Sequence, residues 1–177
     1  MITLITGLPS SGKTLYAASL ILDYTLANAD LVSDGLSPRQ IYADIDRINI
    51  ESVLPAPLDW RQTPDGSILF YDNIHSKETF SRSSVVSDVL RQLEIHRHTR
   101  HDIFLISQSP AFLHRYILPL VTQHFHLSFK FDDISANVTL WDHAVIDTSK
   151  THNCISHQVF NFQPFYKFFN SNLKRNG

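Results

Sequence analysis

The pattern of apolar and polar positions predicts a set of short buried strands. Residues 2–6, 67–72 and 102–108 are continuous apolar runs that each lead into polar residues. Residues 40–45 alternate apolar and polar side chains, which predicts one more strand. Runs of this length, rich in β-branched residues, are typical of strands covered on both faces of a parallel sheet.

Helical spacing appears between these runs. Residues 14–22 lack Gly and Pro and predict a helix that fades near residues 28–30. Apolar positions in residues 84–98 recur at mostly helical spacing, and residues 111–118 predict a third helix that ends before Pro119. The intervening segments, residues 33–38 and the proline-rich residues 54–66, predict loops.

The last third of the chain changes to an extended pattern. Residues 124–131 and 137–145 predict an antiparallel hairpin, with Asp132, Asp133 and residues 135–137 as its turn. Residues 155–162 predict a further strand.

The length and charge describe an ordinary globular chain. We expect one domain over residues 1–170 and a polar tail over residues 171–177 that begins a linker. The formal net charge of -2 gives no overall basic field, so a nucleic-acid contact requires a local patch. Cys154 is the single cysteine, which excludes an internal disulfide. With a core strand starting at Met1 and no long apolar run, we expect a soluble, cytoplasmic protein.

One motif stands between the first strand and the first helix. It reads Gly7-Leu8-Pro9-Ser10-Ser11-Gly12-Lys13-Thr14 and fits G-x-x-x-x-G-K-[ST], the Walker A phosphate loop. Its glycines let backbone N–H groups surround a phosphate at a helix N-terminus. Lys13 is expected to reach the β- and γ-phosphates of ATP and Thr14 to bind Mg²⁺. The alternative is a chance match on a glycine turn before a helix.

Two more strands end in polar side chains that suit the same site. Asp72 ends a strand as a Walker B residue does and predicts a second Mg²⁺ ligand, although it is also suited to start a turn. Gln108 ends another strand and predicts a γ-phosphate sensor or a water-orienting group, unless it caps the helix that begins near Pro110. Asn73 stands where many P-loop ATPases have Glu; its amide can orient water but takes no proton. These features predict a three-layer α/β P-loop domain with a mainly parallel sheet and antiparallel C-terminal strands.

Basic residues and histidines offer further candidates. Arg97 or Arg100 is predicted as an arginine finger in the same or a neighbouring subunit; the alternative is a solvated helix C-terminus that favours cations. His124 and His126 share one strand face, but no Cys or Glu cluster joins them, so a zinc site is disfavoured.

These residues carry a resemblance to a known family. The N-terminal phosphate loop, the Asp72 strand and Glu94-x-His96-Arg97-His98-Thr99 before the strand at residues 102–108 resemble the cytoplasmic domain of the zonular occludens toxin (Zot) family. Its members are inner-membrane assembly and export ATPases of filamentous bacteriophages. The similarity spans about residues 1–170, and residues 164–171 resemble the segment that closes the family's domain.

The resemblance implies a role in phage extrusion. It implies a homo-oligomer of the chain, such as a ring, that works with phage coat proteins and phage DNA. It also implies contact with the host inner membrane through a segment that follows this sequence, where some members carry the toxin activity, which we do not assign here. Asn73 and Arg100 depart from the family's usual Glu and Gly.

Three functions compete on these residues. The first is a Mg²⁺-dependent ATPase that powers virion assembly, with Lys13 as the catalytic cation and Gln108 or Asn73 positioning water. The second, motivated by Asn73, is a nucleotide-binding assembly module with little or no hydrolysis. A small-molecule kinase is the weakest, since it predicts an acceptor pocket and an arginine-rich lid that the pattern does not indicate.

Overall fold

The computed structural model describes residues 1–83, 85–130 and 134–169. One eight-stranded sheet organises them, in the order β3-β2-β4-β5-β1-β6-β7-β8. The strands are β1 (Ile2–Gly7), β2 (Ile41–Asp44), β3 (Val53–Pro55), β4 (Ile68–Tyr71), β5 (Asp102–Ser107), β6 (Gln123–Phe129), β7 (Ser135–Trp141) and β8 (Ser156–Asn161). From β3 to β6 neighbouring strands are parallel, whereas β7 and β8 pair antiparallel. The predicted fold class is confirmed.

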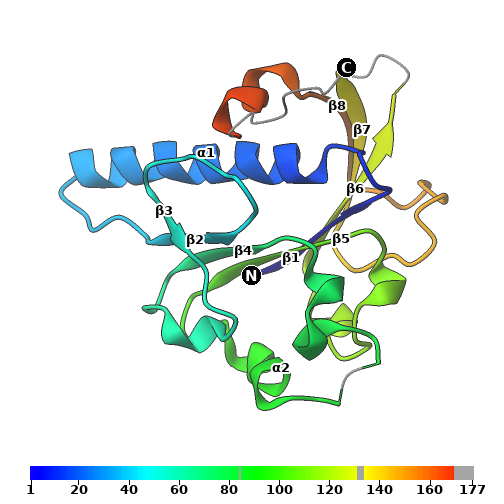
Figure 1. Cartoon of the computed structure of the whole chain (residues 1–177), viewed down its shortest axis with the longest axis horizontal. Helices are drawn as coiled ribbons and strands as arrows, with labels where there is room; N and C mark the ends of the chain where they lie inside the picture. The colour runs from blue at the N-terminus through cyan, green and yellow to red at the C-terminus, as the bar shows by residue number, and fades with distance from the viewer. Residues whose placement is uncertain (84, 131–133, 170–177) are drawn as a thin grey trace, which may run out of the picture.

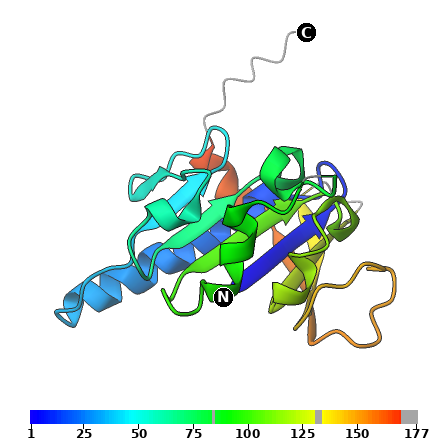
Figure 2. The same cartoon turned by 90° about the horizontal axis from the view of Figure 1, so that it is seen from below.

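Helices cover both faces of the sheet (Figures 1 and 2). Helix α1 (Lys13–Ser33) and the 3₁₀ segment η7 (Gln163–Phe168) lie on one face. The other face carries α2 (Asp88–Gln92) and short 3₁₀ turns, which are η1 (Trp60–Gln62), η2 (Ile74–Ser76), η3 (Glu78–Phe80), η4 (Leu93–Ile95), η5 (Pro110–Phe112) and η6 (Leu118–Leu120). Alternate residues of β1 explain the two cores: Ile5 packs in the α1 core, and Ile2 and Leu4 pack in the opposite one.

Two predicted helices are wrong in extent. The helix expected over residues 84–98 is α2, which starts at Asp88 because the Ser87 hydroxyl accepts the N–H of Leu90; position 84 lies outside the described residues. The helix expected over residues 111–118 is replaced by η5 and η6. Its backbone pairs elsewhere, since the His114 N–H donates to the Phe80 carbonyl at 2.9 Å.

Smaller boundaries also differ from the pattern. Helix α1 continues to Ser33. Strand β7 already begins at Ser135, within the predicted turn, and ends at Trp141 rather than at residue 145. Asp132, Asp133 and the predicted polar tail lie outside the described residues. The proline-rich loop contains β3, where Pro55 is tolerated because β3 is an edge strand.

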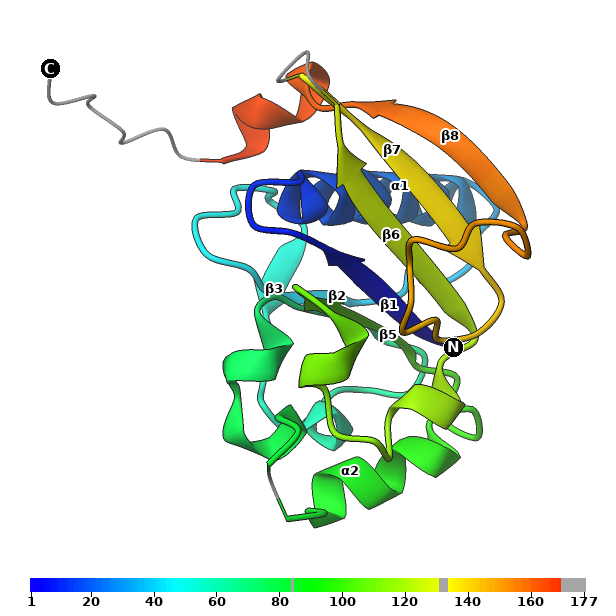
Figure 3. The same cartoon turned by 90° about the vertical axis from the view of Figure 1, so that its right-hand side faces the viewer.

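The order of the strands positions the candidate site. Strands β4, β5 and β1 are adjacent and parallel, so their carboxyl ends meet at one edge, as Figure 3 shows for β1 and β5. In α/β sheets of this kind ligands bind at that edge.

Candidate nucleotide-binding site

The three strand ends named by the sequence converge. Thr6 is in register with Ser107, and the Gly7 N–H donates to the carbonyl of Gln108 at 3.4 Å. Asp72 follows directly on β4, whose last residue, Tyr71, is in register with Leu105 of β5. The structure therefore brings the phosphate loop, Asp72 and Gln108 to one edge of the sheet.

The loop between β1 and α1 has the backbone that its glycines allow. Gly12 has φ +86° and, as the N-cap of α1, leaves the first N–H groups of the helix without a capping side chain. A Cβ on Gly7 would lie 2.4 Å from the Leu127 carbonyl oxygen, so only glycine fits there. Ser10 also has a positive φ of 63°. This turn directs the start of α1 at the loop, a geometry that suits an anion.

Lys13 is held inside the loop. Its side chain is buried, and Nζ donates a hydrogen bond to the Leu8 carbonyl at 2.8 Å, while Leu8 itself is exposed. Burial lowers the pKa of Lys13, and the negative charge of Asp72 partly opposes that shift. A buried ammonium with one carbonyl partner is suited to bind a phosphate oxygen.

The side chains of Thr14 and Asp72, the two predicted Mg²⁺ ligands, are in direct contact. The Thr14 hydroxyl donates to Oδ2 of Asp72 at 2.9 Å, and Oδ1 of Asp72 accepts the Asn73 N–H at 2.7 Å. Hydroxyl and carboxylate oxygens are the ligands that Mg²⁺ prefers, so these two residues fit the ion. Asp72 also stabilises the turn that follows, so its alternative role is present, and metal binding stays a prediction.

Asn73 and Gln108, the two predicted water-orienting residues, differ in exposure. Asn73 is exposed and takes a left-handed backbone (φ 47°), which asparagine tolerates better than most residues. Gln108 is half-buried, and its alternative role as a helix cap is wrong, because Ser109 caps η5 by accepting the Ala111 N–H at 3.2 Å.

Arg97 and Arg100 lie at the opposite edge of the sheet. The carbonyl of Thr99, between them, accepts the Gly66 N–H at 2.7 Å, just before β5 begins at Asp102. The six residues of β5 separate this edge from the loop by about 17 Å. An arginine finger within the same subunit is therefore wrong, while a contribution to a neighbouring subunit stays a prediction.

Sequence reasoning missed a histidine close to the loop. His75 lies in η2, and its Nδ1 is 3.3 Å from the Ser107 hydroxyl. Burial lowers the pKa of His75, the charge of Asp72 raises it and that of Lys13 lowers it. The only sequence signal was its position three residues after Asp72, and the 3₁₀ turn that directs it to β5 was not predicted.

The side chains of His124 and His126 both hydrogen bond to the hydroxyl of Thr6. Nε2 of His124 and Nδ1 of His126 lie 2.6 and 2.9 Å from Thr6 Oγ1, and the Val145 N–H donates to Nδ1 of His124 at 3.1 Å. His124 must then donate from Nε2 to Thr6, so the His124 ring is neutral, while the bond between Thr6 and His126 can run in either direction. Burial lowers the pKa of His124 to about 3.

This buried ring predicts acid sensitivity. His124 has a pKa near 6.5 in the unfolded chain, so below that pH the unfolded state binds the extra proton and stability falls. Between pH 6.5 and 5 the wild type should lose about 2 kcal/mol more unfolding free energy than His124→Asn. Urea unfolding at both pH values measures this, with the exposed His98→Asn as control. Equal losses in wild type and His124→Asn would contradict the neutral ring.

A cavity of about 510 Å³ adjoins the loop. Its lining includes Leu8, Gln108 and His126, with hydroxyl groups from β6, β7 and the 142–155 loop. It places Gln108 and the loop on one continuous surface.

The sheet order, the loop and the Thr14–Asp72 pair define an α/β domain of the P-loop NTPase class. The family model of the zonular occludens toxin (Zot) family matches residues 1–164, and this chain belongs to that family. The resemblance seen in the sequence is thus confirmed.

A relative with a similar sequence supports membership of this family. The putative assembly protein ORF301 of Pseudomonas phage Pf3 is 37% identical over 153 residues, which are 81% of this chain and 48% of that protein. This chain therefore spans about half the length of that relative.

Solved structures share the fold. The N-terminal domain of zonular occludens toxin from Neisseria meningitidis matches with a TM-score of 0.70 and 23% identity, over 95% of this chain and 97% of that one. The genome packaging NTPase B204 of Sulfolobus turreted icosahedral virus 2, in complex with AMPPCP, matches with a TM-score of 0.53 and 10% identity, over 90% of this chain and 96% of that one.

Proposed function

We propose that this chain binds and hydrolyses Mg²⁺-ATP at the Gly7–Thr14 loop to drive filamentous phage assembly and export. The observation that carries the proposal is the 2.9 Å contact between Thr14 and Asp72 beside the buried Lys13. These residues come from α1 and from the end of β4, and only the fold brings them together.

Each residue then has a defined task. Backbone N–H groups of residues 7–14 surround the phosphates, and Lys13 exchanges its bond to the Leu8 carbonyl for bonds to the β- and γ-phosphates. Thr14 and Asp72 would hold Mg²⁺, which neutralises charge on the transferring phosphoryl group when bound. The amides of Gln108 and Asn73 orient water.

The comparisons support the biological setting. The Pf3 relative is described as an assembly protein, and B204 as a genome packaging NTPase solved with a nucleotide analogue. We infer partners of the same kind for this chain, namely phage coat proteins and phage DNA, at the cytoplasmic face of the host inner membrane. Within the described residues, no helix combines the length and apolar character needed to cross a bilayer. Membrane contact would use sequence that the longer relatives have beyond this domain.

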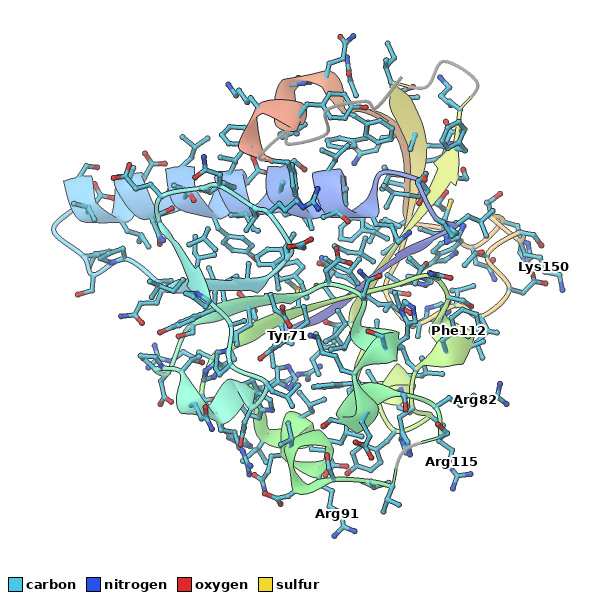
Figure 4. The ribbon with its side chains drawn as sticks, in the orientation of Figure 1. Tyr71, Arg82, Arg91, Phe112, Arg115 and Lys150 are labelled. Carbon is cyan, nitrogen blue, oxygen red and sulfur yellow. The ribbon has the colours of Figure 1, made fainter. Side chains whose placement is uncertain are left out.

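The proposed ATPase function also includes association of several copies of this chain. We infer a homo-oligomer, such as a ring, in which an arginine of one subunit reaches the nucleotide of the next. Arg97 and Arg100 remain candidates for that contact in trans. Figure 4 shows Arg82 and Arg115 projecting outward from the turns on the α2 side of the sheet, which makes them candidates for a contact with a neighbouring subunit as well.

Asn73 supports a second function. If no group accepts the proton of water, the chain is a nucleotide-gated assembly module, in which bound ATP orders subunit contacts without rapid hydrolysis. Introducing a carboxylate with Asn73→Glu should then create turnover. The kinase alternative requires an acceptor in the cavity beside Gln108, and membership of the Zot family gives it no support.

Asp72→Asn tests the metal site. The amide keeps the size of the side chain but loses the charge, so the gain in ATP affinity on adding Mg²⁺ should drop by about 10-fold or more. Calorimetric titration with and without Mg²⁺ measures that gain. Asp44→Asn, on the neighbouring strand β2 and paired with Lys77, is the matched control. An unchanged Mg²⁺ effect in Asp72→Asn would place the ion elsewhere.

A further inference from the structure

The proposed site lacks a carboxylate next to Asp72 that could take a proton. Asn73 follows Asp72, and an amide cannot act as a base at neutral pH. Hydrolysis by this chain therefore needs another proton acceptor, and His75 is the titratable side chain that η2 brings to β5.

Hydrogen bonds fix which nitrogen of His75 carries the proton. The Ser107 hydroxyl donates its single hydrogen to the Ser109 carbonyl at 3.1 Å. At 3.3 Å from Nδ1 of His75 it can then only accept, so Nδ1 holds the proton. The lone pair of a neutral ring is left on Nε2, to which no described residue hydrogen bonds.

The position of Ser107 places this ring near the phosphate loop. Ser107 precedes Gln108 and is in register with Thr6, the residue before Gly7. Asp72 at the end of β4 and Lys13 of α1 are the charged groups that act on His75, while β5 and η5 face it with the uncharged Ser107 and Phe112. Burial is the largest effect and lowers the pKa of the imidazole, which favours the neutral form of the ring.

We propose that Nε2 of His75 accepts the proton of the water that attacks the terminal phosphate, with Ser107 as the positioning residue. This role rests on the proposed ATP hydrolysis. The water oxygen forms a bond to the γ-phosphorus, and the bond from the γ-phosphorus to the bridging oxygen breaks, leaving its electron pair on ADP. The proton moves from water to Nε2 and is then released to solvent, so ATP and water give ADP, orthophosphate and one proton.

His75→Asn is the informative variant. Its amide nitrogen can keep the hydrogen bond to Ser107, but it cannot accept a proton. Turnover should fall about 100-fold or more, with ATP affinity and thermal stability close to wild type. Wild-type turnover should also decline as the pH falls through the pKa of His75, and the residual turnover of His75→Asn should lack this decline. His98→Asn, exposed in a distant turn, is the control.

A spectroscopic readout tests the geometry without nucleotide. Nitrogen-15 NMR of the wild type at pH 7 should show His75 protonated at Nδ1 and unprotonated at Nε2. Ser107→Ala removes the acceptor, so the two tautomers should mix and turnover should fall about 3- to 10-fold. A proton on Nε2 in the wild type would overturn the assignment.

The results of these experiments distinguish the proposed ATP hydrolysis from the proposed role of His75. If wild type exceeds Lys13→Ala in turnover and His75→Asn matches wild type, the role of His75 is wrong and ATP hydrolysis stands. If wild type turns over no faster than Lys13→Ala, both hydrolysis and the role of His75 are overturned. Loss of turnover in His75→Asn with ATP affinity retained, and wild-type turnover in the control His98→Asn, supports the proposal.

Discussion

Lys13→Ala is expected to reduce ATP turnover at least about 100-fold and to weaken ATP binding about 10- to 100-fold. The ammonium is buried within the loop and bonded to the Leu8 carbonyl, so it needs little rearrangement to meet a phosphate. A charged hydrogen bond to phosphate contributes about 1.5–3 kcal/mol to binding, which gives the expected loss of affinity. Its larger effect on turnover follows because negative charge moves onto the bridging oxygen during transfer.

Two measurements check this expectation. Phosphate release gives the turnover, and calorimetry gives the affinity for ATP. Lys150→Ala is the matched control, because this exposed lysine pairs only with Asp147 among the described residues (Figure 4). An affinity that is unchanged in Lys13→Ala would show that the phosphates do not contact this lysine.

Gly12→Ala is expected to destabilise the fold by about 2–4 kcal/mol. Its backbone has φ +86°, which costs a residue with a Cβ about 1 kcal/mol or more. The added Cβ would also lie 2.1 Å from Cε1 of Phe162, a buried ring just beyond β8, and overpacking of this kind costs about 1–3 kcal/mol. The phosphate loop is thus packed directly against the C-terminal part of the domain.

Gly35→Ala separates the cost of the left-handed backbone from the cost of the contact with Phe162. Gly35 has φ +74°, but its Cβ would meet nothing within 4 Å, so only the backbone cost of about 1 kcal/mol is expected. In a Phe162→Ala background, Gly12→Ala should cost no more than Gly35→Ala does. Urea unfolding measures all of these variants, and equal costs for Gly12→Ala and Gly35→Ala in the wild-type background would contradict the contact with Phe162.

The sequence predicts the sheet better than the helices on its second face. Strands β1, β4 and β5 are buried on both sides, so their apolar runs are unambiguous. Helices were expected over residues 84–98 and 111–118, yet in the described residues of these segments only Asp88–Gln92 forms an α-helix, and the other turns are 3₁₀. The backbone groups after β4 and β5 pair with each other, as the bridge between Ser81 and Leu113 shows, and a local pattern does not contain such contacts.

The same limit applies to the candidate site. The motif and the strand ends predicted Lys13, Thr14 and Asp72 because parallel strands deliver their carboxyl ends to one edge. The predicted strand at residues 102–108 already put Arg97 and Arg100 at the end opposite to Gln108, so its direction alone argued against an arginine finger in the same subunit. Spacing could not identify His75, whose position depends on a 3₁₀ turn and on a hydroxyl from a neighbouring strand.

Equilibrium titration of the wild-type chain with ATP, with and without Mg²⁺, tests the central claim most directly. The account predicts saturable binding of one ATP per chain, tighter with Mg²⁺, because the phosphate loop and the Thr14–Asp72 pair lie at one edge of the sheet. The absence of saturable binding under both conditions would contradict the claim that this edge is a nucleotide site.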